Sequence, residues 1–145
     1  MPRTSRSPAA AAADRPVLAG WLDAFSRETA GAPDPDGSRR LAEARAPGGD
    51  DAGLFVWKVG ERAVSVAGYA GPTRSGMRVA PVYTPPDERG HGYATALVAD
   101  LSRELLARGR RWCFLYADLA NPSANRIYRA IGYRPVADAL QLRFV

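Results

Sequence analysis

The sequence predicts a mixed α/β fold built as a single domain. Three observations predict it: helical periodicity up to about residue 45, extended alternation from residue 54, and then a strand, loop, helix and strand in succession. Its 145 residues are enough for one hydrophobic core, and 46% hydrophobic with 24% charged residues is typical of a globular protein. Residues 1–15, rich in alanine and arginine, are expected to form a flexible tail before a domain at 16–145.

Two helices are expected first. The first covers residues 16–29, and the second is short, capped by Ser38, and carries Leu41 and Ala44. The apolar side chains of the first helix fall on one stripe, as an amphipathic helix requires. These side chains are Val17, Leu18, Trp21, Leu22 and Phe25.

Three strands should follow, at 54–59, 63–70 and 77–83. The first two read as a hairpin that turns at Gly60 and Glu61. Pro81 lies inside the third strand and has no backbone N–H to donate to a ladder. We therefore expect that strand to be bulged, or unpaired on one side, at Pro81.

A strand, loop, helix, strand unit occupies the next part of the chain. The helix is expected over 92–108 with Gly109 as its C-cap. The apolar run at 110–118 should be a strand parallel to 77–83, reached by a right-handed crossover and covered on both faces. Asn121 and Pro122 then begin a helix that ends at Gly132, and residues 135–145 suggest a final strand.

The loop before the helix at 92–108 has the composition of an anion site. Backbone N–H groups at a helix N-terminus lack intrahelical partners and lie at the positive end of the helix dipole. Gly90 and Gly92 let the main chain approach an anion closely, and Arg89 offers a charged fork. The loop is neither a Walker loop nor a dinucleotide fingerprint. On its own it is compatible both with a phosphate site and with ordinary turn chemistry.

Charge and cysteine content restrict the partners. Twenty Lys and Arg against 15 Asp and Glu give a net charge of +5, which suits an anionic ligand as well as nucleic acid. The arginines are scattered without interleaved aromatics, so we expect no nucleic-acid partner. No apolar run is long enough to span a membrane, and no membrane partner is expected. The single cysteine, Cys113, reads as a small buried hydrophobe and weakly favours a cytoplasmic location.

Two motifs, in order along the chain, resemble those of the GNAT superfamily of N-acetyltransferases. The stretch RGHGYA at 89–94 resembles the acetyl-CoA motif R/Q-x-x-G-x-G/A, with Arg89, Gly92 and Ala94 at its defining positions. The stretch NPSANRIYRAIGY at 121–133 resembles the second cofactor motif of that superfamily. Its matching positions are Asn121, Ala124, Tyr128, Gly132 and Tyr133. The resemblance covers roughly residues 54–145.

The resemblance implies a GNAT-like mixed, mostly antiparallel sheet with a central splayed parallel strand pair and helices on both faces. It also implies acetyl-CoA as cosubstrate, without a metal, and a pantetheine arm that lies between the splayed strands. Backbone groups near Val82 and Tyr83 would bind that arm, and the amides from Gly90 to Thr95 would bind the pyrophosphate. The cofactor-binding residues implied are Val82, Tyr83, Thr84, Arg89, Gly90, His91, Gly92, Tyr93, Ala94, Thr95, Asn121, Ser123, Asn125 and Tyr128.

The chemistry of acetyl transfer to an amine needs three groups. A lysine-like amine has a pKa of about 10.4, so a base or a water chain must remove its proton. A backbone N–H near Val82 is the candidate donor to the developing oxyanion. Tyr128 stands at the superfamily's position for the acid that protonates the CoA thiolate. For the base, Asp118 is the best candidate, with Glu43, Glu61 and solvent left open.

Two functions remain after this comparison. The first is an N-acetyltransferase acting on a small-molecule or peptide amine, with Trp21, Phe25 and Trp57 as a candidate apolar wall of the acceptor site. The second is a catalytically silent acetyl-CoA-binding regulatory module, which the lack of a carboxylate in residues 77–83 favours. The strand with which relatives usually begin has no counterpart in the tail. Either it is absent, or a partner supplies it, or the chain matches half of a longer relative, and a homodimer is left open.

Overall fold

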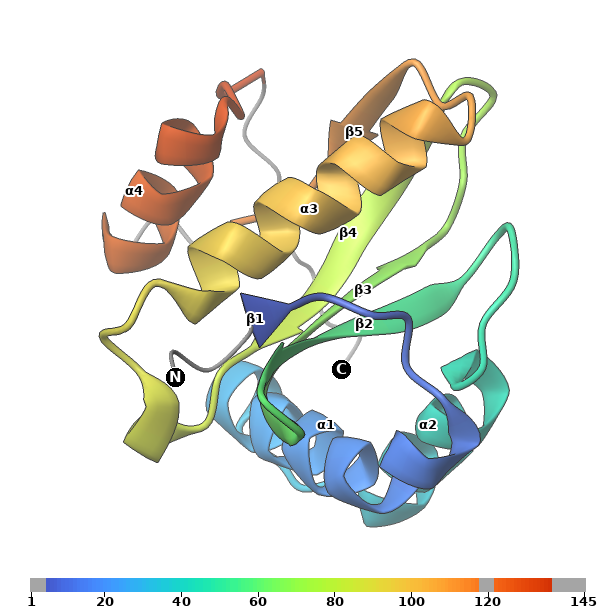
Figure 1. The fold of residues 1–145 in the computed structure, drawn as a ribbon, viewed down its shortest axis with the longest axis vertical. Coiled ribbons are helices and arrows are strands. Elements are labelled where there is room, and N and C mark those ends of the chain that lie inside the picture. Colours follow the sequence, from blue (N-terminus) through green and yellow to red (C-terminus); the bar gives the residue numbers. More distant parts are fainter. Residues whose placement is uncertain (1–4, 118–121, 137–145) are drawn as a thin grey trace, which may run out of the picture.

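A computed structural model describes residues 5–117 and 122–136 of the chain (Figure 1). Within these residues a five-stranded sheet has the order β1-β2-β3-β4-β5 and is antiparallel except for the parallel pair β4 and β5. The strands are β1 (Ser5–Arg6), β2 (Gly53–Val59), β3 (Arg62–Ala70), β4 (Gly76–Tyr83) and β5 (Trp112–Phe114). The α-helices are α1 (Arg15–Ala30), α2 (Pro35–Arg45), α3 (Tyr93–Ala107) and α4 (Pro122–Ile131), with short 3-10 turns η1 (Ala12–Asp14) and η2 (Pro86–Glu88).

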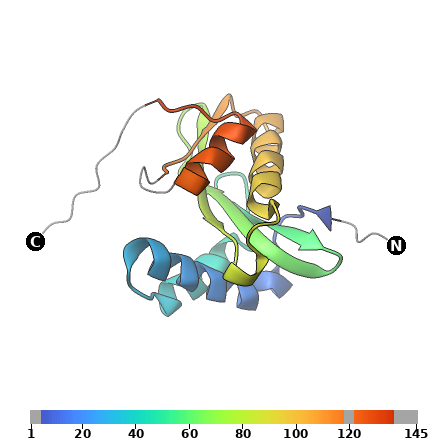
Figure 2. The same cartoon turned by 90° about the vertical axis from the view of Figure 1, so that its left-hand side faces the viewer.

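Helices cover both faces of the sheet. Helices α1 and α2 lie on one face, and α3 and α4 lie on the other (Figure 2). This arrangement confirms the predicted fold class, the first helix, the hairpin of β2 with β3, and the crossover from β4 through α3 to a parallel β5. Among the described residues, no helix has both the length and the apolar character needed to cross a lipid bilayer.

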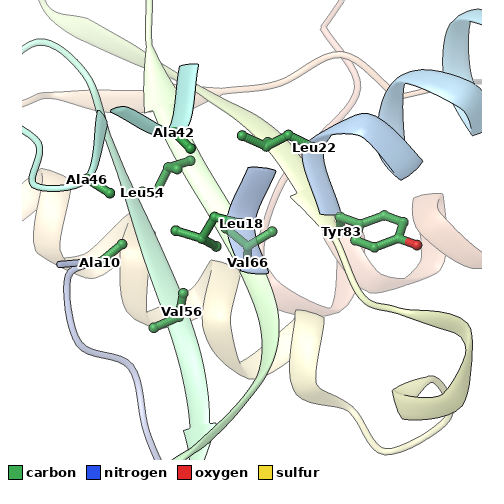
Figure 3. Packing of buried hydrophobic residues seen from close by; sticks show 9 residues of the cluster. All are labelled: Ala10, Leu18, Leu22, Ala42, Ala46, Leu54, Val56, Val66 and Tyr83. Carbon is green, nitrogen blue, oxygen red and sulfur yellow. The ribbon is translucent and has the colours of Figure 1, made fainter. Parts of the chain in front are cut away.

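Two cores result from strand alternation. On β2, Leu54 and Val56 face α1 and α2, where they pack with Leu18 and Leu22 (Figure 3). Phe55, between them, faces the opposite core under α3. Because successive strand side chains point to opposite faces, one apolar strand contributes to both cores. Each fully buried leucine or valine contributes about 1.5–3 kcal/mol relative to leaving it exposed.

A bulge interrupts β4 where the proline predicted it. Tyr69 pairs with Val79 and Ala67 pairs with Val82, so Gly68 of β3 opposes both Ala80 and Pro81. The extra residue reverses the alternation of side chains beyond it. Val79 and Val82 both pack toward α3, and the following residue, Tyr83, lies in the core under α1. Figure 3 shows Tyr83 at the margin of that group of side chains.

The β4 and β5 pair is short, and the two strands then separate. They are paired at three positions, from Gly76 with Trp112 to Arg78 with Phe114. Beyond Arg78, β4 continues to Tyr83 with β3 as its partner on one side. We call the separation of β4 from β5 beyond Arg78 the fork. It opens toward the loop that leads to α3, and so the fork and the glycine loop are neighbours.

The N-terminal expectation is wrong for residues 5–15. Ser5 pairs with Val59 to make β1, so a first strand is present and needs no partner chain to supply it. The Ala10 N–H donates to the Leu54 carbonyl at 2.8 Å, and Ala10 is only 2% exposed. Residues 5–15 are ordered by backbone hydrogen bonds to β2, and such long-range pairing cannot be predicted from amino-acid composition. The packed part of the chain therefore begins by residue 5, ahead of the boundary expected at residue 16.

Two further expectations need correction. Helix α2 begins at Pro35, one turn earlier than expected, because the Asp34 side chain accepts a hydrogen bond from the Gly37 N–H at 3.1 Å, and Asp34 rather than Ser38 is the N-cap. Strand β5 has three residues and is not covered on both faces, since Trp112 is 52% and Tyr116 65% exposed. The expected final strand lies, from residue 137 onward, outside the described residues.

Candidate functional site

The loop between β4 and α3 is built to present backbone N–H groups. Gly90 and Gly92 have φ values of 84° and 76°, in the left-handed region that favours glycine. The first intrahelical bond runs from the Ala96 N–H to the Gly92 carbonyl at 3.1 Å. The N–H groups of residues 93–95 therefore precede the helical ladder. A Cβ at either glycine would have no heavy atom within 4 Å, so the space beside the loop is open.

Arg89 does not extend into that space. Its Nη2 donates to the two carboxylate oxygens of Glu28 on α1 at 2.9 and 3.1 Å. Its Nε donates to the Thr84 carbonyl at 2.8 Å, and its guanidinium lies 5.7 Å from the centre of the Tyr83 ring. The Arg89 guanidinium, which was expected to bind an anion, thus ties the loop to α1. The pair is about half exposed, and such pairs contribute roughly 0–1 kcal/mol, so Arg89 can exchange partners at little cost.

Neighbouring side chains brace the same loop. Glu88 of η2 forms an ion pair with Arg62 at the start of β3. His91 is exposed, and its ring stacks on that of Tyr93 with 5.3 Å between ring centres. The histidine is therefore on the outer side of the loop, beside the helix start. Ala94 and Thr95 are half-buried in the first turn of α3.

The end of β4 is held by a buried serine that sequence reasoning missed. Ser65 of β3 is fully buried, donates from Oγ to the Tyr83 carbonyl at 3.1 Å, and lies 2.8 Å from the Thr84 Oγ1. Its signal in the sequence is a single serine within the largely apolar run at 63–70. Burial, and then the charge of Glu28, raise the pKa of Tyr83, and Arg89 opposes that rise. The Tyr83 side chain is thus a core group, while Val82 is half-buried on the α3 side.

Tyr128 is held on α4 against the α3 core. Its ring packs edge to face with Tyr133 at 6.2 Å, and burial raises the pKa of Tyr128. Tyr133 in turn lies 2.8 Å from the Ser102 Oγ of α3, and burial raises the pKa of Tyr133 to about 12. The Tyr133 N–H donates to the Tyr128 carbonyl at 3.0 Å, which closes the end of α4. Tyr128 therefore has a fixed position relative to α3.

The remaining predicted residues are placed as follows. Asp118 and Asn121 lie outside the described residues, as does the side chain of Ser123. Asn125 is half-buried on α4. Glu61, a candidate base, pairs with Arg6 of β1, at the edge of the described sheet opposite β5.

Other expected features also fall elsewhere. The base candidate Glu43 lines a groove of about 620 Å³ between α1 and α2. The expected aromatic wall is divided, because Trp21 and Phe25 pack with the α1 core and Trp57 packs with the α3 core on the other face. Cys113 is half-buried against the α3 core, and burial raises the pKa of its thiol. Residues 5–117 and 122–136 contain no cluster of side chains suited to a metal ion.

Taken together, three parts of one region have complementary chemistry. The glycine loop offers N–H groups to an anion, and α4 offers a protonated phenol. Beyond Arg78, the fork offers an extended chain the side of β4 that has no strand partner among the described residues. Such a region suits a ligand that has both a phosphate group and a long arm.

Comparisons with known proteins agree with this geometry. Residues 72–142 match the family model described as FR47-like protein, a GNAT-like family. No curated protein matches the sequence significantly. The fold is similar to that of the aminoglycoside N-acetyltransferase AAC(6')-Iy in complex with a CoA-linked bisubstrate analogue, with a TM-score of 0.79, 15% identity, and coverage of 98% of this chain and 99% of that chain.

Two further structures share the fold. One is described as a predicted acetyltransferase with acetyl-CoA from Clostridium acetobutylicum, with a TM-score of 0.71, 17% identity, and coverage of 97% of this chain and 96% of that chain. The other is described as a transcriptional regulator from Bacillus halodurans, with a TM-score of 0.77, 20% identity, and coverage of 97% and 100%. At these identities the likeness establishes the fold.

Proposed function

We propose that this chain is a GNAT-superfamily N-acetyltransferase that transfers an acetyl group from acetyl-CoA to a primary amine, a proposal supported by the FR47-like match at residues 72–142 and by the shared fold. The observation that carries the proposal is the fork, where β4 leaves β5 at Arg78 and continues, paired with β3 on its other side, to the glycine loop. The AAC(6')-Iy structures contain CoA or a CoA-linked analogue, which supports acetyl-CoA as the cosubstrate. A small-molecule or peptide amine is the proposed acceptor.

The described residues fit acetyl-CoA. The N–H groups of residues 93–95 and the open space beside Gly90 and Gly92 suit its pyrophosphate. The side of β4 near Val82 that has no strand partner in the described part of the chain suits its pantetheine arm. When bound, acetyl-CoA supplies an activated acetyl thioester. The chain's own contribution is to orient that thioester at the fork and to handle protons on either side of it.

Tyr128 is the proposed acid. Burial raises the pKa of Tyr128 above its ordinary value of about 10, so its hydroxyl keeps its proton near neutral pH and can give it to the departing CoA thiolate. The Val82 N–H is the proposed donor to the acetyl oxygen, where negative charge develops. Asp118 remains the proposed base, with Glu43, Glu61 and solvent as alternatives.

A second candidate is a catalytically silent acetyl-CoA-binding module. Two observations favour it. Strand β4 contains no carboxylate, and Glu28, whose charge raises the pKa of Tyr83, is paired with Arg89. The fold shared with a structure described as a transcriptional regulator is compatible with it. Binding without turnover is what this candidate requires.

The deciding experiment has two readouts on the purified chain. Calorimetric titration with acetyl-CoA should show binding, and a thiol assay should show CoA release that depends on an added primary amine. Release with at least one amine of a broad panel supports the transferase. Binding with no acceptor-dependent release over the panel would leave the silent module, and absence of acetyl-CoA binding would remove both.

The glycine loop gives a matched test of cofactor binding. Gly92→Ala is expected to weaken acetyl-CoA binding at least about tenfold, because a left-handed alanine costs about 1–2 kcal/mol and the loop will relax away from its anion-binding shape. Gly31→Ala is the control. Gly31 has a φ of 74° and the same open space, but it ends α1 instead of beginning α3. Both variants should lose similar stability in urea, and equal loss of acetyl-CoA affinity in both would contradict the assignment.

A further inference from the structure

The open face of the fork is aromatic. On β5 and its continuation, Cys113 and Leu115 pack into the core under α3 and α4. The alternate residues Trp112, Phe114 and Tyr116 therefore point to the opposite face. There Trp112 is 52% and Tyr116 65% exposed, and the Phe114 and Tyr116 rings meet edge to face at 6.3 Å.

Arg78 stands at the base of the fork on the same face. It is the last residue of β4 that pairs with β5, opposite Phe114. Its neighbours Met77 and Val79 are buried toward α3, so the exposed Arg78 side chain points the other way. The guanidinium carbon lies 5.0 Å from the centre of the Tyr116 ring, a distance at which the ring attracts the cation. Tyr116 thus holds the charge of Arg78 beside the fork.

A second guanidinium adds to this charge. Arg45, the last residue of α2, is half-buried, and its pKa is lowered by burial and then by the charge of Arg78. Neither arginine has a carboxylate partner among residues 5–117 and 122–136. The positive charge of Arg78 acts on Arg45, and an anion bound at Arg78 would relieve that repulsion.

We propose that the acceptor amine also carries an anionic group, a carboxylate or a phosphate, which binds to Arg78 on the open face of the fork, with the charge of Arg45 adding to the attraction. The inference rests on the proposed function, since it places the acceptor beside a thioester held in the fork. The α3 side of the fork is filled by the core under α3 and α4, so an acceptor approaches from the face that carries Arg78 and Tyr116. Arginine suits this role because its planar guanidinium group can form two parallel hydrogen bonds with a carboxylate or a phosphate.

Matched pairs of amines test the charge requirement without turnover. Free CoA is added to form a dead-end complex, and binding is measured by calorimetry for amino acids against their amides and for phosphoethanolamine against ethanolamine. Charge-assisted hydrogen bonds predict a loss of about ten- to a hundredfold in affinity when the anionic group is removed. The two sets of pairs tell a carboxylate from a phosphate. Equal affinity for charged and neutral members in both sets, or no binding of any charged amine, overturns the proposal.

Arginine variants test which residues cause the preference for charged amines. Arg78→Gln is expected to abolish the discrimination, and Arg45→Gln and Arg78→Lys are each expected to retain part of it. Arg103→Gln is the control, because Arg103 is an exposed arginine of α3 that pairs with Asp100 on the other face. If Arg78→Gln lowers thermal stability but keeps the preference for charged amines, the arginines are structural and the inference is wrong.

Kinetics separate this inference from the proposed function. In acetyl transfer, Arg78→Gln should raise KM for a charged amine and leave kcat nearly unchanged. Turnover of charged and neutral amines with equal KM would keep the transferase and overturn the inference. Arg78-dependent binding of charged amines without any thiol release would support the anion site and overturn the proposed acetyl transfer.

Discussion

Tyr128→Phe is expected to keep acetyl-CoA affinity and to lower turnover by about two to four orders of magnitude, the usual contribution of a positioned general acid. The substitution removes one oxygen from a half-buried ring that packs edge to face with Tyr133, so the packing of α4 is preserved. The measurements are calorimetric titration with acetyl-CoA and amine-dependent thiol release. Unchanged turnover would remove Tyr128 from the proposed chemistry.

The neighbouring tyrosine provides the control for that substitution. Tyr133→Phe removes the hydroxyl that lies 2.8 Å from the Ser102 Oγ and is expected to cost about 1 kcal/mol of stability with little change in turnover. The pH dependence distinguishes the two hydroxyls further. A phenol donates only while it is protonated, and burial raises the pKa of Tyr128, so the wild-type rate should fall above about pH 10. Tyr128→Phe should lack that fall.

Gly68→Ala is expected to lower the free energy of unfolding by about 1–3 kcal/mol and to weaken acetyl-CoA binding. A Cβ at Gly68 would lie 2.8 Å from the Ala80 carbonyl oxygen and from Leu54 Cδ2, and 3.0 Å from Pro81 Cδ. The Leu54 side chain can move, but the contact with the Ala80 backbone requires β4 to shift at the point where its alternation reverses. Urea denaturation measures the stability, and calorimetry measures the affinity.

A second glycine shows what the same substitution does without a clash. Gly20 lies within α1 and has no heavy atom within 4 Å of an added Cβ, so Gly20→Ala should raise stability by about 0.5–1 kcal/mol. Its acetyl-CoA affinity should equal that of the wild type. A Gly68→Ala variant that behaves like Gly20→Ala would show that the bulge tolerates the methyl group and does not control the fork.

Local features were predictable because their causes are local. The helix at 15–30 follows from an apolar stripe, and the bulge follows from a proline that cannot donate a hydrogen bond. The start of α2 was missed, although Asp34 before Pro35 is also a local signal for an N-cap followed by a first-turn proline.

Features that depend on distant pairing were not predictable. The alanine-rich segment at 5–15 has the composition of a tail, and only its hydrogen bonds to β2 make it a strand and a bridge. The run at 110–118 reads as a strand covered on both faces because it is apolar throughout. Which of its faces is covered depends on where α3 and α4 pack, and the sequence of the run does not indicate that.

In this protein, the glycine loop, the bulge at Pro81 and the order of the two motifs follow directly from the sequence, since each depends on the conformational limits of a few adjacent residues. The partners of the charged groups follow only from how the chain folds. Arg89 pairs with Glu28, and Arg78 lies over the Tyr116 ring, across intervals of 61 and 38 residues that no local pattern encodes. Folding brings these charges together because the cores under α1 and α3 fix where each strand and helix ends.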